Sequence, residues 1–128
     1  MQQGENSTLT TLDLHNNNID DEGVATLIDA LQSNASLRNL DLRGNDGISK
    51  QAQILLLKLV NDISSIKATL QSNHTLKCLS VEILDEDEEI QTHIDMATKI
   101  NSKHESNPEA AGREKVIQAQ LHSTKRAE

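Results

Sequence analysis

The stretch STLTTLDLHNNNIDDEGVATLIDALQSNASLRNLDLRGNDGI, residues 7–48, contains the phrase L-x-x-L-D-L twice, starting at Leu9 and at Leu37. A third and weaker copy, L-x-x-L-x-V, starts at Leu76. Self-similarity over a few tens of residues is typical of repeat architectures, in which each unit is one supersecondary element. We therefore expect a chain built from three stacked units.

Each copy of the phrase has the alternation of a short β-strand. Successive side chains of a strand point to opposite faces, so Leu12 and Leu14 should face inward. Asp13 and His15 should then face solvent. Acidic residues follow, and after them comes an apolar set at the spacing of a helix that packs one stripe onto the strands. This set is Val24, Leu27, Ile28 and Leu31. One strand and one helix cannot bury both faces alone, which explains why the phrase recurs.

The second unit is longer than the first. Leu37 follows Leu9 by 28 residues, whereas Leu76 follows Leu37 by 39, so the second unit has 11 extra residues. They fall between Ile48 and Ile66, in the segment KQAQILLLKLVNDISS. This segment predicts a helix that is longer than its counterpart in the first unit.

The pattern over residues 7–84 resembles the ribonuclease-inhibitor type of leucine-rich repeat, whose units have this length and alternate a parallel strand with a helix. In that family an Asn eight residues after the first Leu satisfies backbone groups of the turn, and these amides form a ladder between repeats. Asn17 and Asn45 occupy this position. The third copy has Leu84 there, so the resemblance implies that the ladder and the solenoid end at this point.

The segment after residue 84 follows a different pattern. DEDEE at 85–89 is an acidic block, which suits a helix start because negative charge stabilises the positive end of the helix dipole. Apolar residues at helical spacing follow at Ile90, Ile94, Ala97 and Ile100. We therefore divide the chain into a leucine-rich-repeat solenoid at 1–84 and an acidic linker with C-terminal helices at 85–128.

A last helix is expected to begin at Pro108, with Asn107 as its N-cap. Pro suits the first helical position and biases the residue before it away from helical backbone angles. Val116, Ile117 and Leu121 would form its narrow apolar stripe. The predicted fold class is α/β: a short leucine-rich-repeat solenoid of parallel strands and helices with a helical C-terminal cap.

Composition argues against several classes of partner. The 128-residue chain has no Phe, Trp or Tyr and a formal net charge of −8. Without aromatic side chains it lacks the usual stacking platforms for single-stranded nucleic acid, and its charge disfavours phosphate backbones and anionic lipid. We therefore expect a protein partner, with no nucleic acid and no membrane.

The N-terminal residues and the cysteine content predict the compartment. The start, MQQGENST, has no basic and apolar leader, and no apolar run approaches the length of a membrane span. Cys78 is the only cysteine, which excludes an internal disulfide and a multi-thiolate zinc site. We interpret Cys78 as a small strand residue, and we expect an intracellular, cytoplasmic protein.

Three N-x-S/T sites are interpreted as one repeat position rather than as glycan acceptors. They are Asn6, Asn34 and Asn73, each three residues before the first Leu of a predicted strand. Asn at such a position can adopt the left-handed conformation that ends a helix. We therefore interpret all three as helix-ending positions at which Asn can take a left-handed backbone.

The residues that could carry chemistry form no recognisable active site. The five histidines have no metal-binding spacing such as H-E-x-x-H, and no Cys cluster accompanies them. No pattern places a nucleophile, a base and an orienting group together, and no glycine-rich turn precedes a helix in phosphate-binding form. We therefore expect no enzymatic activity and predict neither a cofactor nor a metal.

The solvent-facing strand positions are the candidate binding surface, because such solenoids bind partners on the concave face of the sheet. Asp13 and Asp41 would lie on neighbouring strands about 4.8 Å apart, where like charges repel unless a base such as Arg43 intervenes. We interpret this pair as a common feature of the repeat slot rather than a dedicated cation site, although a partner's Lys or Arg would complement it. The predicted columns are Thr11, Asn39 and Cys78; Asp13, Asp41 and Ser80; and His15, Arg43 and Glu82.

We therefore predict a non-catalytic protein-interaction module that binds a protein partner on this concave face. Two alternatives stay open. One is a GTPase activator like the Ran-activating leucine-rich-repeat proteins, which would need a longer crescent and has only Arg38 and Arg43 near the strands. The other is an actin-capping module like tropomodulin, whose terminal domain is a short solenoid that ends in a helix.

The N-terminal edge of the first strand is a further candidate surface. This strand begins near Leu9 after only polar residues, so a strand edge and a helix flank would face water. We expect this edge to associate with a partner or a second copy, or to follow earlier repeats of a longer array.

Overall fold

The computed structural model describes residues 9–81 and 88–127. Its strands form one parallel sheet whose order follows the sequence: β1 (Thr11–Asp13), β2 (Asn39–Asp41) and β3 (Cys78–Ser80). The helices are α1 (Asp21–Leu31), α2 (Lys50–Val60), α3 (Ile66–Leu70), α4 (Glu88–Lys103) and α5 (Pro108–Ala127). Parallel strands joined through helices fit the predicted α/β class.

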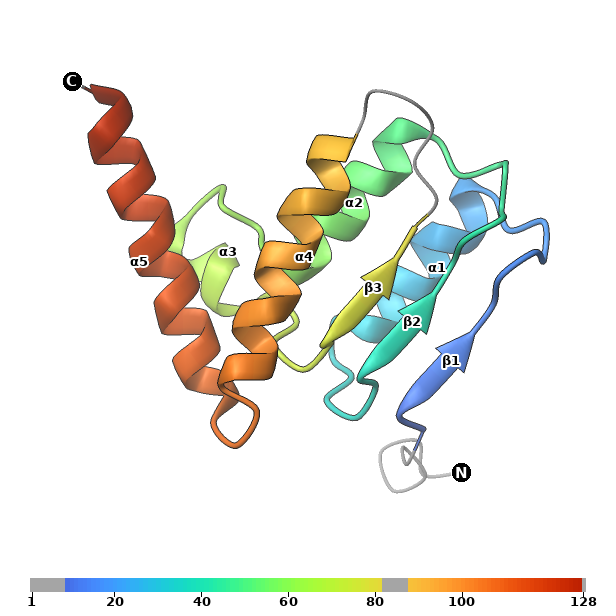
Figure 1. The fold of residues 1–128 in the computed structure, drawn as a ribbon, viewed down its shortest axis with the longest axis horizontal. Helices are drawn as coiled ribbons and strands as arrows, with labels where there is room; N and C mark the ends of the chain where they lie inside the picture. The colour runs from blue at the N-terminus through green and yellow to red at the C-terminus, as the bar shows by residue number, and fades with distance from the viewer. Residues whose placement is uncertain (1–8, 82–87, 128) are drawn as a thin grey trace.

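A layer of helices covers one face of the sheet (Figure 1). In this layer α2 lies between α1 and α4 and contacts both, while α4 also contacts β3. The inward residues of the strands and the apolar stripes of the helices form one core, in which Leu40, Leu79, Leu56 and Ile94 are buried. Removing such side chains from water is the main force that stabilises a fold of this kind. Helix α4 therefore shares the core of the repeats.

The prediction of a lengthened second helix is wrong. α1 and α2 each have 11 residues, and the extra residues form a turn and the separate short helix α3. Helix α2 ends at Val60, and its C-cap Asn61 has backbone angles that are no longer helical. Ser65 then begins α3 as its N-cap, because its hydroxyl accepts from the amide N–H of Ala68 at 3.0 Å. Asn61 at the end of α2 and Ser65 at the start of α3 thus divide a segment whose composition predicts one continuous helix.

Asn45 connects the turn after β2 to the turn after β1. Its Oδ1 accepts from the backbone N–H of Asn17 at 2.9 Å and of Ile19 at 2.8 Å. Its Nδ2 donates to the backbone carbonyls of Leu14 at 3.1 Å and Leu42 at 2.8 Å. Asn45 is buried, so these backbone groups have little access to water. The amide ladder implied by the family resemblance is present between the first two units.

The left-handed residues lie in the β1 turn rather than at the N-x-S/T sites. Among the described residues, the non-glycine residues with positive φ are Asn16 and Asn18, so the prediction is wrong for Asn34 and Asn73. Asn6 and Leu84 lie outside the described residues. Gly44 also has positive φ, and a Cβ there would lie 1.8 Å from Oδ1 of Asn16, so this close approach of two turns requires glycine.

Asn34 and Asn73 instead start a second amide ladder at the opposite end of the strands. Asn73 Oδ1 accepts from the N–H groups of Thr75 and Leu76, both at 2.9 Å, which shapes the turn into β3. Its Nδ2 donates back to the carbonyls of Leu31 at 2.9 Å and Asn34 at 3.3 Å. The side chain therefore both orders its own turn and holds the preceding unit.

Asn101 in α4 extends this ladder by one step. Its Nδ2 donates to the carbonyls of Asn73 at 3.3 Å and Leu76 at 2.8 Å. Its Oδ1 is buried and has no hydrogen-bond partner among the described residues. In the earlier unit the Asn73 Oδ1 accepts from the N–H three residues later, that of Leu76. The N–H three residues after Asn101, that of His104, instead donates to the carbonyl of Ile100, as in a helix.

Two C-terminal helices are present as predicted, but α5 buries a different face. Ile90, Ile94 and Ala97 are buried, and α5 begins at Pro108. Of the predicted α5 stripe, however, Ile117 and Leu121 are exposed. Among residues 108–121 of α5, whose burial the structure describes, the buried ones are instead Ala111, Gly112 and Lys115. Periodicity of apolar residues failed here because a lysine takes one of the buried positions.

Lys115 of α5 is buried, with only 1% of its surface exposed. Its side chain connects α5 to the end of α2 and to the turn before β3. Its Nζ donates to the carbonyl of Val60 at 2.6 Å, at the end of α2, and to the carbonyl of Asn73 at 3.3 Å. A third contact, at 3.0 Å, joins Nζ to Nδ1 of His74. Burial disfavours the ammonium and lowers the pKa of Lys115 to about 7. Unpaired carbonyls at a helix C-terminus are natural partners for such a side chain.

Replacing Asn45 by Ala should lower the free energy of unfolding by roughly 1–3 kcal/mol, because buried backbone groups lose their partner. Asn17→Ala is the matched control, since Asn17 is exposed and its amide donates at 3.2 Å to the carbonyl of His15 in its own turn. Chemical denaturation measures both variants. Equal destabilisation would contradict the importance of the Asn45 bonds.

Stability should rise with pH from about 7 to about 10 because of Lys115. The pKa of an unfolded Lys is about 10.4, so in this window the unfolded chain binds more protons than the folded one. The expected gain over the window is about 2–4 kcal/mol.

Lys115→Met supplies the comparison for this effect, because it removes the titrating group. The neighbouring His74 titrates below the window, since burial, followed by the charge of Lys115, lowers its pKa. Denaturation at a series of pH values should show the free energy of unfolding of the wild type rising relative to the variant. A difference that stays constant with pH would contradict the assignment.

Candidate functional site

The candidate binding surface is the face of the sheet opposite the helix layer. The strand register aligns Thr11 with Asn39 and Cys78 in one row across the sheet. All three side chains are exposed. The neighbouring row consists of Asp13, Asp41 and Ser80. The structure therefore brings together the residues of these two predicted columns. His15 and Arg43 of the third column follow β1 and β2, whereas Glu82 lies outside the described residues.

Arg43 neutralises the central carboxylate of this face. Its Nε donates to Oδ1 of Asp41 at 2.9 Å, and its Nη2 donates to Oδ2 at 2.8 Å, so the pair is bidentate. These hydrogen bonds lower the pKa of Asp41 to about 2. Only about a fifth of the Asp41 side chain is exposed, against 65% for Arg43. The guanidinium is therefore the more accessible member of the pair.

His15 has the same position relative to Asp13 as Arg43 has to Asp41. Its Nδ1 hydrogen-bonds Oδ1 of Asp13, and this contact raises the pKa of His15 and lowers that of Asp13. Half of each side chain is exposed, so solvent screens the interaction. The expected repulsion between Asp13 and Asp41 is relieved because each carboxylate has a base two residues further along the chain.

Asp13, His15 and Asp41 also form a group of three side chains with metal-ligating atoms. One such atom from each lies within 4.8 Å of the other two. Sequence reasoning missed this group because its members combine a D-x-H phrase with an Asp from the next unit, which matches no contiguous metal motif. A cation there would compete with Arg43 for Asp41, and with His15 for Asp13. We therefore interpret the group as the Arg43–Asp41 ion pair beside the hydrogen-bonded pair of His15 and Asp13 on a polar face.

Cys78 is a free and exposed thiol at the end of the first row. Its Sγ lies 3.7 Å from Oγ of Ser80, on the same face of β3. The site therefore includes a weakly hydrogen-bonded thiol flanked by small polar residues.

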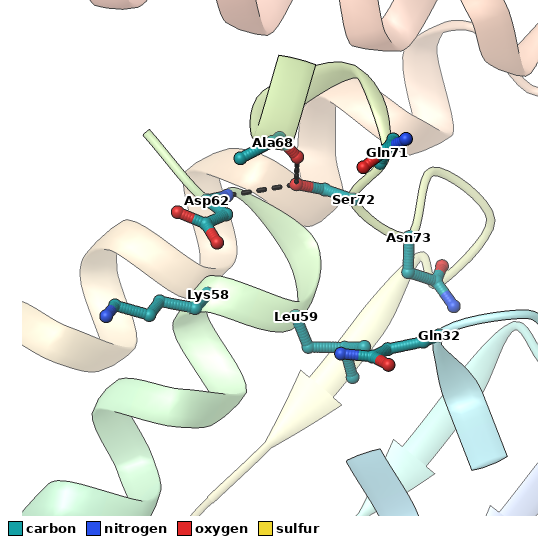
Figure 2. A pocket seen from close by; sticks show the side chains of 8 residues that line it. All are labelled: Gln32, Lys58, Leu59, Asp62, Ala68, Gln71, Ser72 and Asn73. Atoms are coloured by element: carbon teal, nitrogen blue, oxygen red, sulfur yellow. Dashed lines mark hydrogen bonds between the residues drawn. The ribbon is translucent and has the colours of Figure 1, made fainter. Parts of the chain in front are cut away.

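A separate hollow of about 330 Å³ lies beside the inserted helix α3 (Figure 2). Ser72 is used structurally there, because its Oγ accepts from the N–H of Asp62 at 3.0 Å and donates to the carbonyl of Ala68 at 3.1 Å. The lining residues are Gln32, Lys58, Leu59, Asp62, Ala68, Gln71, Ser72 and Asn73. This hollow lies between the insertion and the ends of α1 and α2, and the Ser72 hydroxyl connects the start of the turn after α2 to α3.

Comparison with known protein families identifies part of the chain as a leucine-rich repeat. Residues 5–27 and 33–51 match a family model described as leucine rich repeat. The chain therefore contains a leucine-rich repeat segment, and the matched residues include β1, the first part of α1, and β2. No curated protein matches the chain at a significant level. Among the helices that the structure describes, none combines the length and apolar character that a bilayer crossing requires.

Removing the Asp13 carboxylate should lower the pKa of His15 toward the ordinary histidine value, because its hydrogen bond to Asp13 is the main cause of the upward shift. Asp13→Asn makes this change. Thr11→Ala is the control on the same strand and face, and it keeps the carboxylate. Titration of the His15 ring protons by NMR measures the pKa in each variant. An unchanged value in Asp13→Asn would contradict the pairing.

Proposed function

We propose that this chain is a short solenoid of ribonuclease-inhibitor-type leucine-rich repeats that acts as a non-catalytic protein-interaction module. In this proposal residues 1–84 form the repeats, and the helices within 85–128 cap their C-terminal end. The matched repeat segment and the core shared by α2, β3 and α4 support this architecture. Leucine-rich repeat domains are generally non-catalytic, and their stacked units present extended surfaces to proteins.

The observation that carries the proposal is the ordered polar face of the sheet. Thr11, Asn39 and Cys78 are exposed in one row, whereas Leu40 and Leu79 on the same strands face the buried core. The backbone under this row is fixed by parallel pairing and by the two asparagine ladders. A partner that binds there would therefore meet a preformed surface, and little conformational entropy would be lost on the protein's side.

The charges of the face suit a partner of mixed charge. Arg43 is exposed and held in one orientation by Asp41, and arginine is among the residues that most often dominate binding energy at interfaces. A partner's Lys or Arg would find Asp13 more accessible than Asp41, because 54% of the Asp13 side chain is exposed. Such complementarity contributes to specificity and to the rate of association.

The proposed location is the cytoplasm. Cys78 is a free, exposed thiol, and the reducing conditions of that compartment keep such thiols from forming disulfides. The proposed partner is therefore an intracellular protein.

Asn39→Arg tests the proposal, because it places a bulky charge in the middle of the first row. Proteins captured from a cell extract by the wild type are identified, purified and titrated against the variant. The affinity should fall about tenfold or more, a loss of about 1.4 kcal/mol, because a large side chain blocks close contact with the sheet.

Gln51→Arg is the matched control, since Gln51 is exposed on α2, in the helix layer. It should bind the same proteins with the affinity of the wild type. If Gln51→Arg weakens binding as much as Asn39→Arg, the sheet face is not the binding surface.

A further inference from the structure

The edge of β3 is closed by a side chain rather than by another strand. Gln91 of α4 accepts from the N–H of Val81 at 3.1 Å and donates to the carbonyl of Leu79 at 3.0 Å. These are the two groups that a residue of a following parallel strand, opposite Ser80, would engage. Asp95 also accepts from the Gln91 amide at 2.7 Å and so holds its orientation. A fourth strand therefore meets an occupied edge on this side.

The edge of β1 differs, because its outward backbone groups are not used within the sheet. The N–H of Asn39 donates to Thr10 at 3.0 Å, and the N–H of Leu14 donates to Asp41 at 2.9 Å. In this parallel register the N–H and carbonyl groups of Thr11 and Asp13 point away from β2. Within residues 9–81 and 88–127 these four groups have no backbone partner.

Apolar residues of the first unit are also less covered than those of the later units. Leu9 is 54% exposed, whereas its equivalents Leu37 and Leu76 are 2% and 0% exposed. Leu12 and Leu14 pack against the core but are only partly buried, unlike their buried equivalents in β2 and β3. Neighbouring units supply the cover in this architecture, so within the described part of the chain the outer side of β1 presents both unpaired backbone and apolar surface.

We propose that a second copy of this chain pairs with the β1 edge, antiparallel, about a two-fold axis through Leu12. In that register Thr11 of each copy faces Asp13 of the other, and each facing pair exchanges two backbone hydrogen bonds. Thr11 and Asp13 are the residues whose backbone groups point outward, and they are placed symmetrically about Leu12. The two sheets become one continuous sheet of six strands in the described part of the dimer.

The side chains and the closed β3 edge favour this occupant. Asp13 faces a threonine and His15 faces Leu9, so no acid lies directly opposite another acid across the axis, and like charges there would be destabilising. The partly exposed Leu12 side chains meet at the axis. Since Gln91 occupies the other edge, copies cannot add head to tail, and the two-fold pairing gives a closed dimer rather than a filament. This proposal is independent of the function proposed for the sheet face.

Thr11→Pro tests the pairing without disturbing β2. Proline removes the outward N–H and is tolerated at a sheet edge. Thr11→Val is the matched control, because it also removes the hydroxyl but keeps the N–H. Light scattering should show the mass of the wild type and of Thr11→Val doubling across a concentration series into the high micromolar range, while Thr11→Pro stays monomeric with a normal circular dichroism spectrum.

Cross-linking tests the register, in a Cys78→Ser background. Facing residues of a hydrogen-bonded antiparallel pair have Cα atoms about 5.5 Å apart, within the span of a disulfide, whereas diagonal residues are about 7–8 Å apart. Thr11→Cys mixed with Asp13→Cys should therefore form a disulfide-linked dimer faster than Thr11→Cys alone. A monomeric wild type, a Thr11→Pro variant that still dimerises, or cross-linking of Thr11→Cys alone at the rate of the mixture would overturn the proposal.

Discussion

Buried carbonyl and N–H groups at the turns must find partners within the protein, and asparagine side chains are what this chain supplies. Asn45 satisfies backbone groups of two units at one end of the strands, and Asn73 does the same at the other end. The three-residue strands are short, and further backbone hydrogen bonds extend their pairing at each end, so the backbone pairing and these amides together hold the spacing of the units. The helix layer and the alignment of the polar sheet face both depend on that spacing.

Much of the fold was predictable because repeat offsets convert directly into register. The 28 and 39 residues between Leu9, Leu37 and Leu76 place Thr11, Asn39 and Cys78 in one row, as the sheet has them. Periodicity could not locate the break between α2 and α3, since it depends on capping by Ser65 within an otherwise helical segment. It also could not predict the buried face of α5, because Lys115 is buried only through its contacts with the end of α2 and the turn before β3.

The candidate site was likewise predictable only in part from the sequence. Its columns follow from strand alternation, but the partners of its charges do not, because a side chain chooses between several neighbours at similar distance. The sequence indicated Arg43 as a base that would separate Asp13 from Asp41, but it did not pair Arg43 with Asp41 alone or His15 with Asp13, as the structure does. The sequence indicated a left-handed backbone at Asn34 and Asn73, whereas in the structure their side chains hydrogen-bond the backbone of nearby turns. Gln91 has no signal in sequence at all, since its function depends on where α4 packs.

The closure of β3 by Gln91 has a consequence for how such a chain can change in length. Helix α4 contacts α2, β3 and α5, and it makes no contact with α1 or β1. In the proposed C-terminal cap, α4 therefore packs on β3 and α2, and α5 packs on α3 and α4. Units inserted ahead of β2 would leave these contacts as they are, so an array of this type could lengthen by duplication in its interior without a new ending. The side-chain amide of Gln91 would then end the sheet in the same way whatever the number of units before β3.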